Sequence, residues 1–275
     1  MLPQKRELAL LTIKKKFLTY FSSEELHAMN FWFLEELDHS PESAWDELTT
    51  YWLKNLLDHK PIQYLFNRAF FGKLDLFVNE YTLIPRPETE ELCQHILEHP
   101  KNNINSTHRV LDIGTGSGCI PIWLKHNRKD WLISAIDISS EALAVAQKNA
   151  EKYNTQISLQ QIDVLGLQRI EENYSIIISN PPYIPKKEMQ RLNKNVTNFE
   201  PHLALFVEDN DPLIFYKKIA NLLAKKNSVE QIWLEIDSET AEINCEIFNK
   251  IGVAQIIHDY SGNPRFIFCE PKKEN

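Results

Sequence analysis

The segment Gly114-Thr115-Gly116-Ser117-Gly118 stands between the apolar run Val110–Ile113 and a stretch from residue 118 to 126 that suits a helix. It holds three of the seven glycines in a chain of 275 residues. Glycine lets the backbone turn sharply and approach another molecule closely. A strand, a glycine-rich turn and a helix in this order predict an α/β sheet with a ligand at the turn.

More apolar strands alternate with helices along the rest of the chain. The predicted strands cover residues 131–136, 158–162, 175–179, 231–236, 253–259 and 265–269. The predicted helices begin at Ser139, at Asp211-Pro212 and near residue 239, and the second of them ends near Lys225. Apolar strands that alternate with helices predict a doubly wound, mostly parallel sheet.

The first part of the chain has a different pattern. Its apolar residues have helical spacing, no glycine precedes Gly72, and Ser22 with Glu25 forms a capping box. Two short strands are expected around a turn near Gly72. We therefore expect three parts: a helical domain over residues 1–66, a β-hairpin linker over 67–86 and the α/β domain over 87–275.

Composition excludes several classes of function. The chain carries 30 Lys and Arg against 38 Asp and Glu, a net charge of -8, which argues against stable nucleic-acid binding. Its four cysteines form no C-x-x-C pair, so we expect neither a disulfide framework nor a metal site. No apolar run is long enough to span a membrane and no signal-peptide core stands at the start, which indicates a cytoplasmic protein.

Acidic residues follow the glycine-rich turn at spacings that suit a nucleoside ligand. Asp137 ends the next strand about twenty residues on, where its carboxylate can accept hydrogen bonds from ribose hydroxyls. Asp163 and Val164 follow the third strand and could meet an adenine amino group. A nicotinamide dinucleotide stays possible, but G-x-G-x-G favours S-adenosylmethionine over the dinucleotide pattern G-x-G-x-x-G. The predicted cofactor-binding residues are Asp112, Gly114, Thr115, Gly116, Gly118, Asp137, Ile138, Asp163, Val164 and Asn180.

The sharpest motif is Asn180-Pro181-Pro182-Tyr183, which ends the apolar strand Ile176–Ser179. Two prolines restrict the backbone, so Asn180 is presented rigidly at the carboxyl edge of the sheet. Its side-chain oxygen and the Pro181 carbonyl are two acceptors that suit one planar NH2 group. Tyr183 can stack on the amide or base that carries this nitrogen. The simpler alternative is a turn that only terminates a strand.

With three further segments, Pro61–Leu65, Leu83–Glu90 and Phe199–Leu205, these motifs resemble the PrmC/HemK family. Its members are class I, Rossmann-like methyltransferases that act on a glutamine of peptide chain release factors. The resemblance implies transfer of a methyl group from S-adenosylmethionine to the glutamine of a Gly-Gly-Gln motif, with S-adenosylhomocysteine as product. It implies that the helical domain grips the release factor. The resemblance places three catalytic residues at the reacting amide, which are Asn180, Pro181 and Tyr183. It adds Pro182, Arg86 and Glu88 to the wall that binds the substrate.

The chain departs from the family pattern in two loops, at Val207–Leu213 and at Asp237. Two other substrates stay open: a glutamine of a ribosomal protein, and an adenine amino group of DNA or RNA. Against the second stand the acidic balance and the 92 residues after Tyr183, which leave no room for a base-reading domain. A scaffold that binds nucleotides without catalysis is the non-enzymatic alternative. We expect a monomer.

Overall fold

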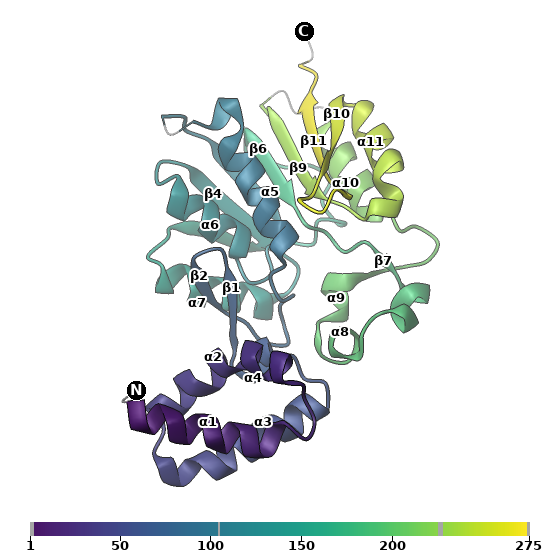
Figure 1. The fold of residues 1–275 in the computed structure, drawn as a ribbon. Coiled ribbons are helices and arrows are strands. Elements are labelled where there is room, and N and C mark those ends of the chain that lie inside the picture. Colours follow the sequence, from purple (N-terminus) through teal and green to yellow (C-terminus); the bar gives the residue numbers. More distant parts are fainter. Residues whose placement is uncertain (1–2, 104, 225–227, 274–275) are drawn as a thin grey trace. The chain divides into compact units, whose positions relative to one another are not determined.

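The computed structural model describes residues 3–103, 105–224 and 228–273, and the chain forms two compact units (Figure 1). The first unit contains the residues up to Asn67 together with Lys194–Phe199. The second contains Arg68–Asn193 and Glu200–Asn275. Among the described residues, no helix has both the length and the apolar character needed to cross a membrane.

The first unit is helical. Its helices are α1 (Pro3–Phe17), α2 (Ser23–His39), η1 (Glu42–Ala44), α3 (Trp45–Leu57), α4 (Ile62–Leu65) and α8 (Lys194–Phe199). The predicted capping box is present, because Glu25 N–H donates to Ser22 Oγ and Ser22 N–H donates to the Glu25 carboxylate. Phe33 is fully buried and stacks on Trp52 with ring centroids 5.1 Å apart, so aromatic packing forms the centre of this core.

The second unit is built on a seven-stranded sheet with the strand order β10-β11-β9-β6-β3-β4-β5. Its strands are β3 (Arg109–Ile113), β4 (Leu132–Asp137), β5 (Ile157–Gln161), β6 (Ile176–Ser179), β9 (Gln231–Glu235), β10 (Gly252–His258) and β11 (Pro264–Pro271). The pairs among β5, β4, β3, β6 and β9 are parallel, whereas β11 is antiparallel to both β9 and β10. The prediction of a doubly wound, mostly parallel sheet is confirmed.

Helices cover both faces of the sheet. On one face pack α5 (Pro87–Glu98), α6 (Cys119–Asn127) and α7 (Ser140–Lys152), and on the other α10 (Ile214–Leu223) and α11 (Ala241–Asn249). Successive residues of β6 alternate between the two cores: Ile176 and Ile178 face one, Ile177 the other. This alternation explains why the strand is apolar throughout.

Short elements complete the second unit. They are β1 (Arg68–Phe71), β2 (Leu74–Phe77), η2 (Pro100–Asn102), β7 (Ile184–Pro185), η3 (Lys186–Arg191), α9 (His202–Leu205), β8 (Phe206–Val207) and η4 (Ser238–Thr240). The hairpin β1–β2 turns at Gly72 as predicted, and its buried side chains join the core beside α5 and α6.

One predicted helix start is wrong. Asp211 does not cap α10, which begins at Ile214 after the non-capping Leu213, and the Asp211 carboxylate instead pairs with Lys217 at 2.6 Å. The predicted end of this helix near Lys225 lies outside the described residues. By contrast, the Ser139 hydroxyl accepts from Ala142 N–H at the start of α7, as expected.

The order of the strands determines where a ligand can bind. From β3 the chain builds outward through β4 to β5, and it then returns to the other side of β3 with β6. In an open α/β sheet, the crevice at such a reversal, beyond the carboxyl ends of the strands, is the preferred ligand site. The glycine-rich turn after β3 and Asn180 after β6 both lie at this point.

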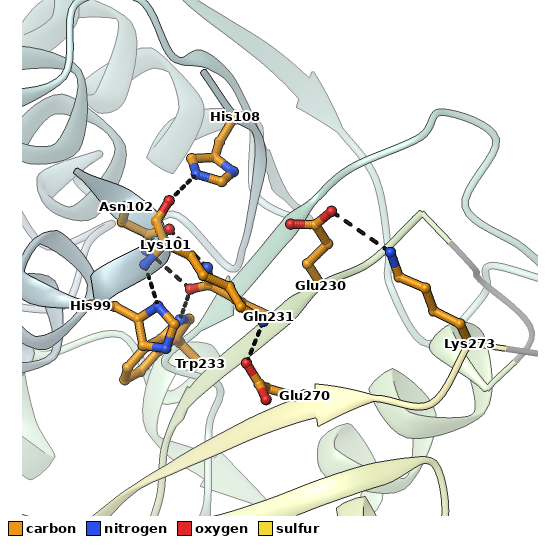
Figure 2. Close-up of polar contacts among 9 residues, drawn as sticks. All are labelled: His99, Lys101, Asn102, His108, Glu230, Gln231, Trp233, Glu270 and Lys273. Atoms are coloured by element: carbon orange, nitrogen blue, oxygen red, sulfur yellow. Dashed lines mark hydrogen bonds and ion pairs between the residues drawn. The ribbon is translucent and has the colours of Figure 1, made fainter. Parts of the chain in front are cut away.

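The opposite, amino end of the sheet holds a buried polar cluster (Figure 2). Asn102 and Gln231 are fully buried and exchange two side-chain hydrogen bonds, of 3.0 and 2.7 Å. Asn102 also donates to the Ile96 carbonyl, and the Trp233 indole N–H donates to Gln231 Oε1. This pairing ties η2 to the first residue of β9.

We expect Gln231→Leu to lower the free energy of unfolding by about 2–4 kcal/mol, because it leaves the amide of Asn102 and the indole of Trp233 without their partner in the interior. Chemical denaturation followed by circular dichroism measures this loss. The same substitution at the exposed Gln147 of α7 is the control and should change stability by less than about 0.5 kcal/mol. Equal effects at the two sites would contradict a structural role for the cluster.

Candidate active site

A cavity of about 440 Å³ opens at the carboxyl ends of the central parallel strands. Its wall contains the turn after β3, the ends of β4 and β6, and the segment after β5. The remaining wall comes from the segment before α5, the first turns of α5, α6 and α7, the helix α9 and Phe215 of α10. The volume falls in the range of small-molecule sites. Of the predicted site residues, those that line it are Arg86, Gly114, Thr115, Gly116, Asp137, Ile138, Asp163, Val164, Asn180, Pro181 and Pro182.

The three glycines of the turn have left-handed backbones, with φ of +77° at Gly114, +53° at Gly116 and +79° at Gly118. A Cβ added at Gly114 or Gly116 would meet no protein atom within 4 Å, so bare backbone faces the cavity there. At Gly118 an added Cβ would lie 3.1 Å from Ala146 Cβ of α7. Gly118 does not line the cavity, and it serves the close packing of α6 on α7.

Asp137 connects the turn to the next strand. One carboxylate oxygen accepts from Gly116 N–H at 2.9 Å, and the other accepts from Ser139 N–H at 3.0 Å. Each carboxylate oxygen can accept more than one hydrogen bond. Asp137 therefore holds the turn in place and keeps acceptor capacity for a ligand in the cavity. Asp163 lies further along the wall, with one oxygen bound to Leu165 N–H.

Asp112 lies beneath the turn rather than in the cavity wall. It is fully buried, and neither carboxylate oxygen has a hydrogen-bond partner among the described residues. Burial raises the pKa of Asp112 to about 7, the nearby Thr115 hydroxyl lowers it in part, and the negative charge of Asp137 raises it further. The site thus contains a carboxyl group whose charged form is destabilised by its surroundings.

This environment makes stability depend on pH. Because the folded-state pKa of Asp112 lies above the value of an unfolded chain, the contribution of Asp112 to wild-type stability falls as the pH rises from about 4 to about 7. Asparagine carries no charge at any pH. We expect the stability of Asp112→Asn relative to wild type to increase by roughly 2–4 kcal/mol between about pH 4 and about pH 8.

Thermal unfolding at a series of pH values measures this difference. The same change at the exposed Asp130 is the control. A constant difference between Asp112→Asn and wild type across the range would show that Asp112 is not the group that titrates.

Asn180 is held by a chain of buried polar groups. Its side-chain nitrogen donates to Thr89 Oγ1 at 3.1 Å, and the Thr89 hydroxyl donates to Glu235 Oε2 at 2.7 Å. Thr89 and Glu235 are 3% and 2% exposed. This hydrogen bond uses the nitrogen of the Asn180 amide. The oxygen of the same amide is not used in it and points away from Thr89. Asn180 lines the cavity, as do Thr89 and Pro181.

Tyr183 is the third of the predicted catalytic residues. It is not part of the cavity wall, and its ring packs against the core that contains α10 and α11. Burial raises the pKa of Tyr183, and the carboxylate of Glu235 adds to the rise. The prediction that its ring stacks on a substrate amide is untested by this arrangement.

Arg86 joins two walls of the cavity. Its guanidinium pairs with Glu200 Oε1 at 2.5 Å, and Ile84 N–H donates to the other oxygen of the same carboxylate. Glu200 is 4% exposed, so its carboxylate is shielded from water, whereas the Arg86 side chain is 33% exposed. Glu88 does not line the cavity, although its charge acts on Glu235 across the start of α5. The Glu200 carboxylate therefore connects its own segment to Ile84 and Arg86 through a hydrogen bond and an ion pair.

Comparison with known proteins identifies the family. A model described as "Methyltransferase small domain" matches residues 89–199. "Release factor glutamine methyltransferase" of Flavobacterium psychrophilum is 41% identical over 236 residues, which cover 84% of this chain and 81% of the relative. The chain belongs to the release factor glutamine methyltransferases. A relative of the same name from Streptococcus pneumoniae is 45% identical and covers 72% of this chain and 69% of its own length.

Solved structures agree on the fold of these methyltransferases. The catalytic domain of hMettl16, solved in complex with MAT2A 3'UTR hairpin 6, superposes with a TM-score of 0.57 at 18% identity, covering 74% of this chain and 77% of that one. A methyltransferase from Pyrococcus furiosus gives 0.51 at 16% identity, covering 82% and 100%. These neighbours confirm the Rossmann-like methyltransferase fold, and the relatives above confirm the resemblance indicated by the motifs.

Two polar residues of this methyltransferase site escaped the sequence reasoning. Thr89 stands in the segment Leu83–Glu90, and its neighbours in sequence do not indicate which group its hydroxyl bonds. Glu235 is the last residue of a strand whose five residues are all buried. The sequence does contain one sign of the role of Glu235. It is a charged residue at the end of an apolar strand, and a charged group that is buried there needs partners in the interior. Both family departures lie outside the cavity wall, and Asp237 caps η4 by accepting from Glu239 N–H.

Proposed function

We propose that this protein transfers a methyl group from S-adenosylmethionine to the side-chain amide nitrogen of the glutamine in the Gly-Gly-Gln motif of peptide chain release factors. The observation that carries the proposal is Asn180 with Pro181 at the cavity wall, since their two oxygens suit the two hydrogens of one amide NH2 group. Relatives that cover most of the chain carry the name of this activity.

The residues of the turn suit the nucleoside cofactor. Gly114 and Gly116 offer bare backbone, and Asp137 and Asp163 offer carboxylate oxygens around the same cavity. Thr115, Ile138 and Val164 complete this part of the wall. Asp112 and Gly118 lie behind the turn and outside the cavity wall. When bound, S-adenosylmethionine supplies the electrophilic methyl group.

The chain's own task is to position a weak nucleophile. The lone pair of an amide nitrogen is delocalised into the carbonyl, so correct placement is the main source of acceleration, worth up to ~7–11 kcal/mol in favourable cases. Asn180 Oδ1 and the Pro181 carbonyl accept the two N–H hydrogens. These bonds strengthen as positive charge develops on nitrogen, so they stabilise the transition state more than the ground state.

We assign recognition of the release factor to the helical domain over residues 1–66. Several large apolar side chains of α1 and α2, including Leu8, Leu11 and Phe31, are about half exposed, as expected of a surface that meets another protein. The hairpin segment 67–86 would link this domain to the methyltransferase domain over 87–275. Translation takes place in the cytoplasm, where we place the protein as a monomer.

The decisive experiment incubates the purified protein with labelled S-adenosylmethionine and purified release factor, and then maps the label by mass spectrometry. Label on the Gly-Gly-Gln glutamine supports the proposal. Parallel incubations with ribosomal proteins, DNA and RNA test the other substrates. Label that appears only in those samples, or in none, would reject the assignment.

A further inference from the structure

Two buried polar side chains, those of Thr89 and Glu235, lie behind Asn180, and a turn that only ends a strand does not need them. Asn180, Thr89 and Glu235 come from segments 91 and 146 residues apart in the chain, yet their side chains form one continuous row of hydrogen bonds. The register of the sheet places Leu234 beside Ser179, so Glu235 and Asn180 follow neighbouring residues of adjacent strands. Thr89, in the first turn of α5, stands between them.

The direction of each hydrogen bond follows from the charge on Glu235. A carboxylate can only accept, and a hydroxyl has one proton to donate. With Glu235 ionised, the Thr89 proton points to Glu235 Oε2, and Thr89 Oγ1 can then only accept from Asn180. The Asn180 amide must present its nitrogen to Thr89, which leaves its oxygen for the substrate.

We propose that Thr89 and Glu235 are positioning residues that fix the orientation of the Asn180 amide, so that the site accepts a glutamine NH2 and rejects a side chain without one. This inference rests on the proposed function and identifies the residues that make the reaction selective for an amide substrate. In the reversed orientation Asn180 would offer its own NH2 to the substrate, and two donors would face each other.

Protonation of Glu235 removes the constraint. A protonated carboxyl can donate to Thr89, and the Thr89 proton can then point to an Asn180 oxygen, which stabilises the reversed amide. Burial raises the pKa of Glu235 to about 7, with a further rise from the carboxylate of Glu88 and a partial offset from Thr89, Arg265 and Arg86. The ionised, correctly oriented form therefore gains population as the pH rises through neutrality.

Other titratable and charged groups surround Glu235 and share its environment. They are Arg86, Glu88 and Cys93 at or in α5, Cys119 in α6, Tyr183 after β6, Tyr216 in α10 and Arg265 in β11. Burial raises the pKa values of both cysteines and both tyrosines, which keeps these four groups neutral near pH 7. Glu235 is thus the neutral-range titrating group in direct contact with Thr89.

The test measures selectivity as well as rate. Release factor with its natural motif and release factor in which the motif glutamine is replaced by glutamate are titrated, by calorimetry, onto the enzyme in the presence of S-adenosylhomocysteine. We expect Glu235→Gln and Thr89→Val to reduce the ratio of the two affinities by about 10-fold, the size of one oriented hydrogen bond. Thr89→Ser, which restores the hydroxyl, should recover the wild-type ratio.

The wild-type protein provides a second, independent measurement. Its selectivity ratio should rise between about pH 6 and about pH 8, and in Glu235→Gln this ratio should be flat over the same range. Thr155→Val and Glu270→Gln are the matched controls, because their side chains bond to Ala150 and Lys101 outside the site.

The outcomes separate this inference from the function on which it rests. An unchanged ratio in both variants, or a wild-type ratio that does not vary with pH, overturns the positioning role while methylation of the release factor still stands. The pH measurement on wild type decides the question even where a variant fails to fold. A wild-type protein that neither methylates nor binds release factor instead overturns the proposed function.

Discussion

Replacing Asn180 by alanine is expected to lower kcat by about 100- to 1,000-fold, the usual effect of removing one group that stabilises developing charge in a transition state. The substitution removes the oxygen that receives the substrate amide, and it also removes the donor to Thr89. Because Asn180 is one of many residues in the cavity wall, the affinity for S-adenosylmethionine should change by no more than about threefold.

Single-turnover kinetics and equilibrium binding of the cofactor separate these two effects. Asn127→Ala is the matched control, since Asn127 is exposed and donates within its own helix to the Trp123 carbonyl. Normal turnover by Asn180→Ala would show that the cavity does not use this acceptor, and the proposed reaction would have to be abandoned.

The second large effect is expected from Gly116→Val, which should weaken S-adenosylmethionine binding by about 100-fold. With φ at +53° a β-branched residue is strained, at a cost of about 1–3 kcal/mol to the fold. A Cβ added at Gly116, which lines the cavity, would meet no protein atom within 4 Å. It would therefore project into the space that the ligand needs.

Gly262→Val is the control that separates the effect of backbone strain from the effect of blocking the cofactor site. Gly262 has φ of +85° and also has nothing within 4 Å of an added Cβ, but it lies in the turn between β10 and β11. Both variants should unfold at lower temperature, while Gly262→Val retains wild-type affinity for the cofactor in isothermal titration. If both variants bound the cofactor equally well, the turn after β3 would not be the cofactor site.

Local pattern was sufficient to predict the sheet and the two motifs that flank the cavity. The glycine-rich turn, Asn180 and Pro181 are each adjacent in sequence to the strand that positions them, so a reading along the chain could find them. Gly118 shows the limit of that reading. In sequence it continues the pattern of Gly114 and Gly116, and only the packing of α6 on α7 reveals its different role.

Contacts between distant segments could not be predicted in this way. The link from Asn180 to Glu235 depends on the register of β6 with β9 and on the first turn of α5, neither of which leaves a local pattern. The ion pair of Arg86 with Glu200 likewise joins residues 114 positions apart. The position of Tyr183 depends on which way the chain turns after Pro182, which two prolines restrict but do not determine.

Strand β9 carries a buried polar side chain at each end, Gln231 at the amino end and Glu235 at the carboxyl end. In a survey of all single substitutions in living cells, the two positions should produce different signatures. Changes at Gln231 should reduce the amount of protein that survives proteolysis, because they act on folding. Changes at Glu235 that keep its volume should leave abundance near normal and reduce the fraction of release factor that is methylated. Within one strand of five residues, a polar side chain at one end thus supports folding and a polar side chain at the other end supports activity.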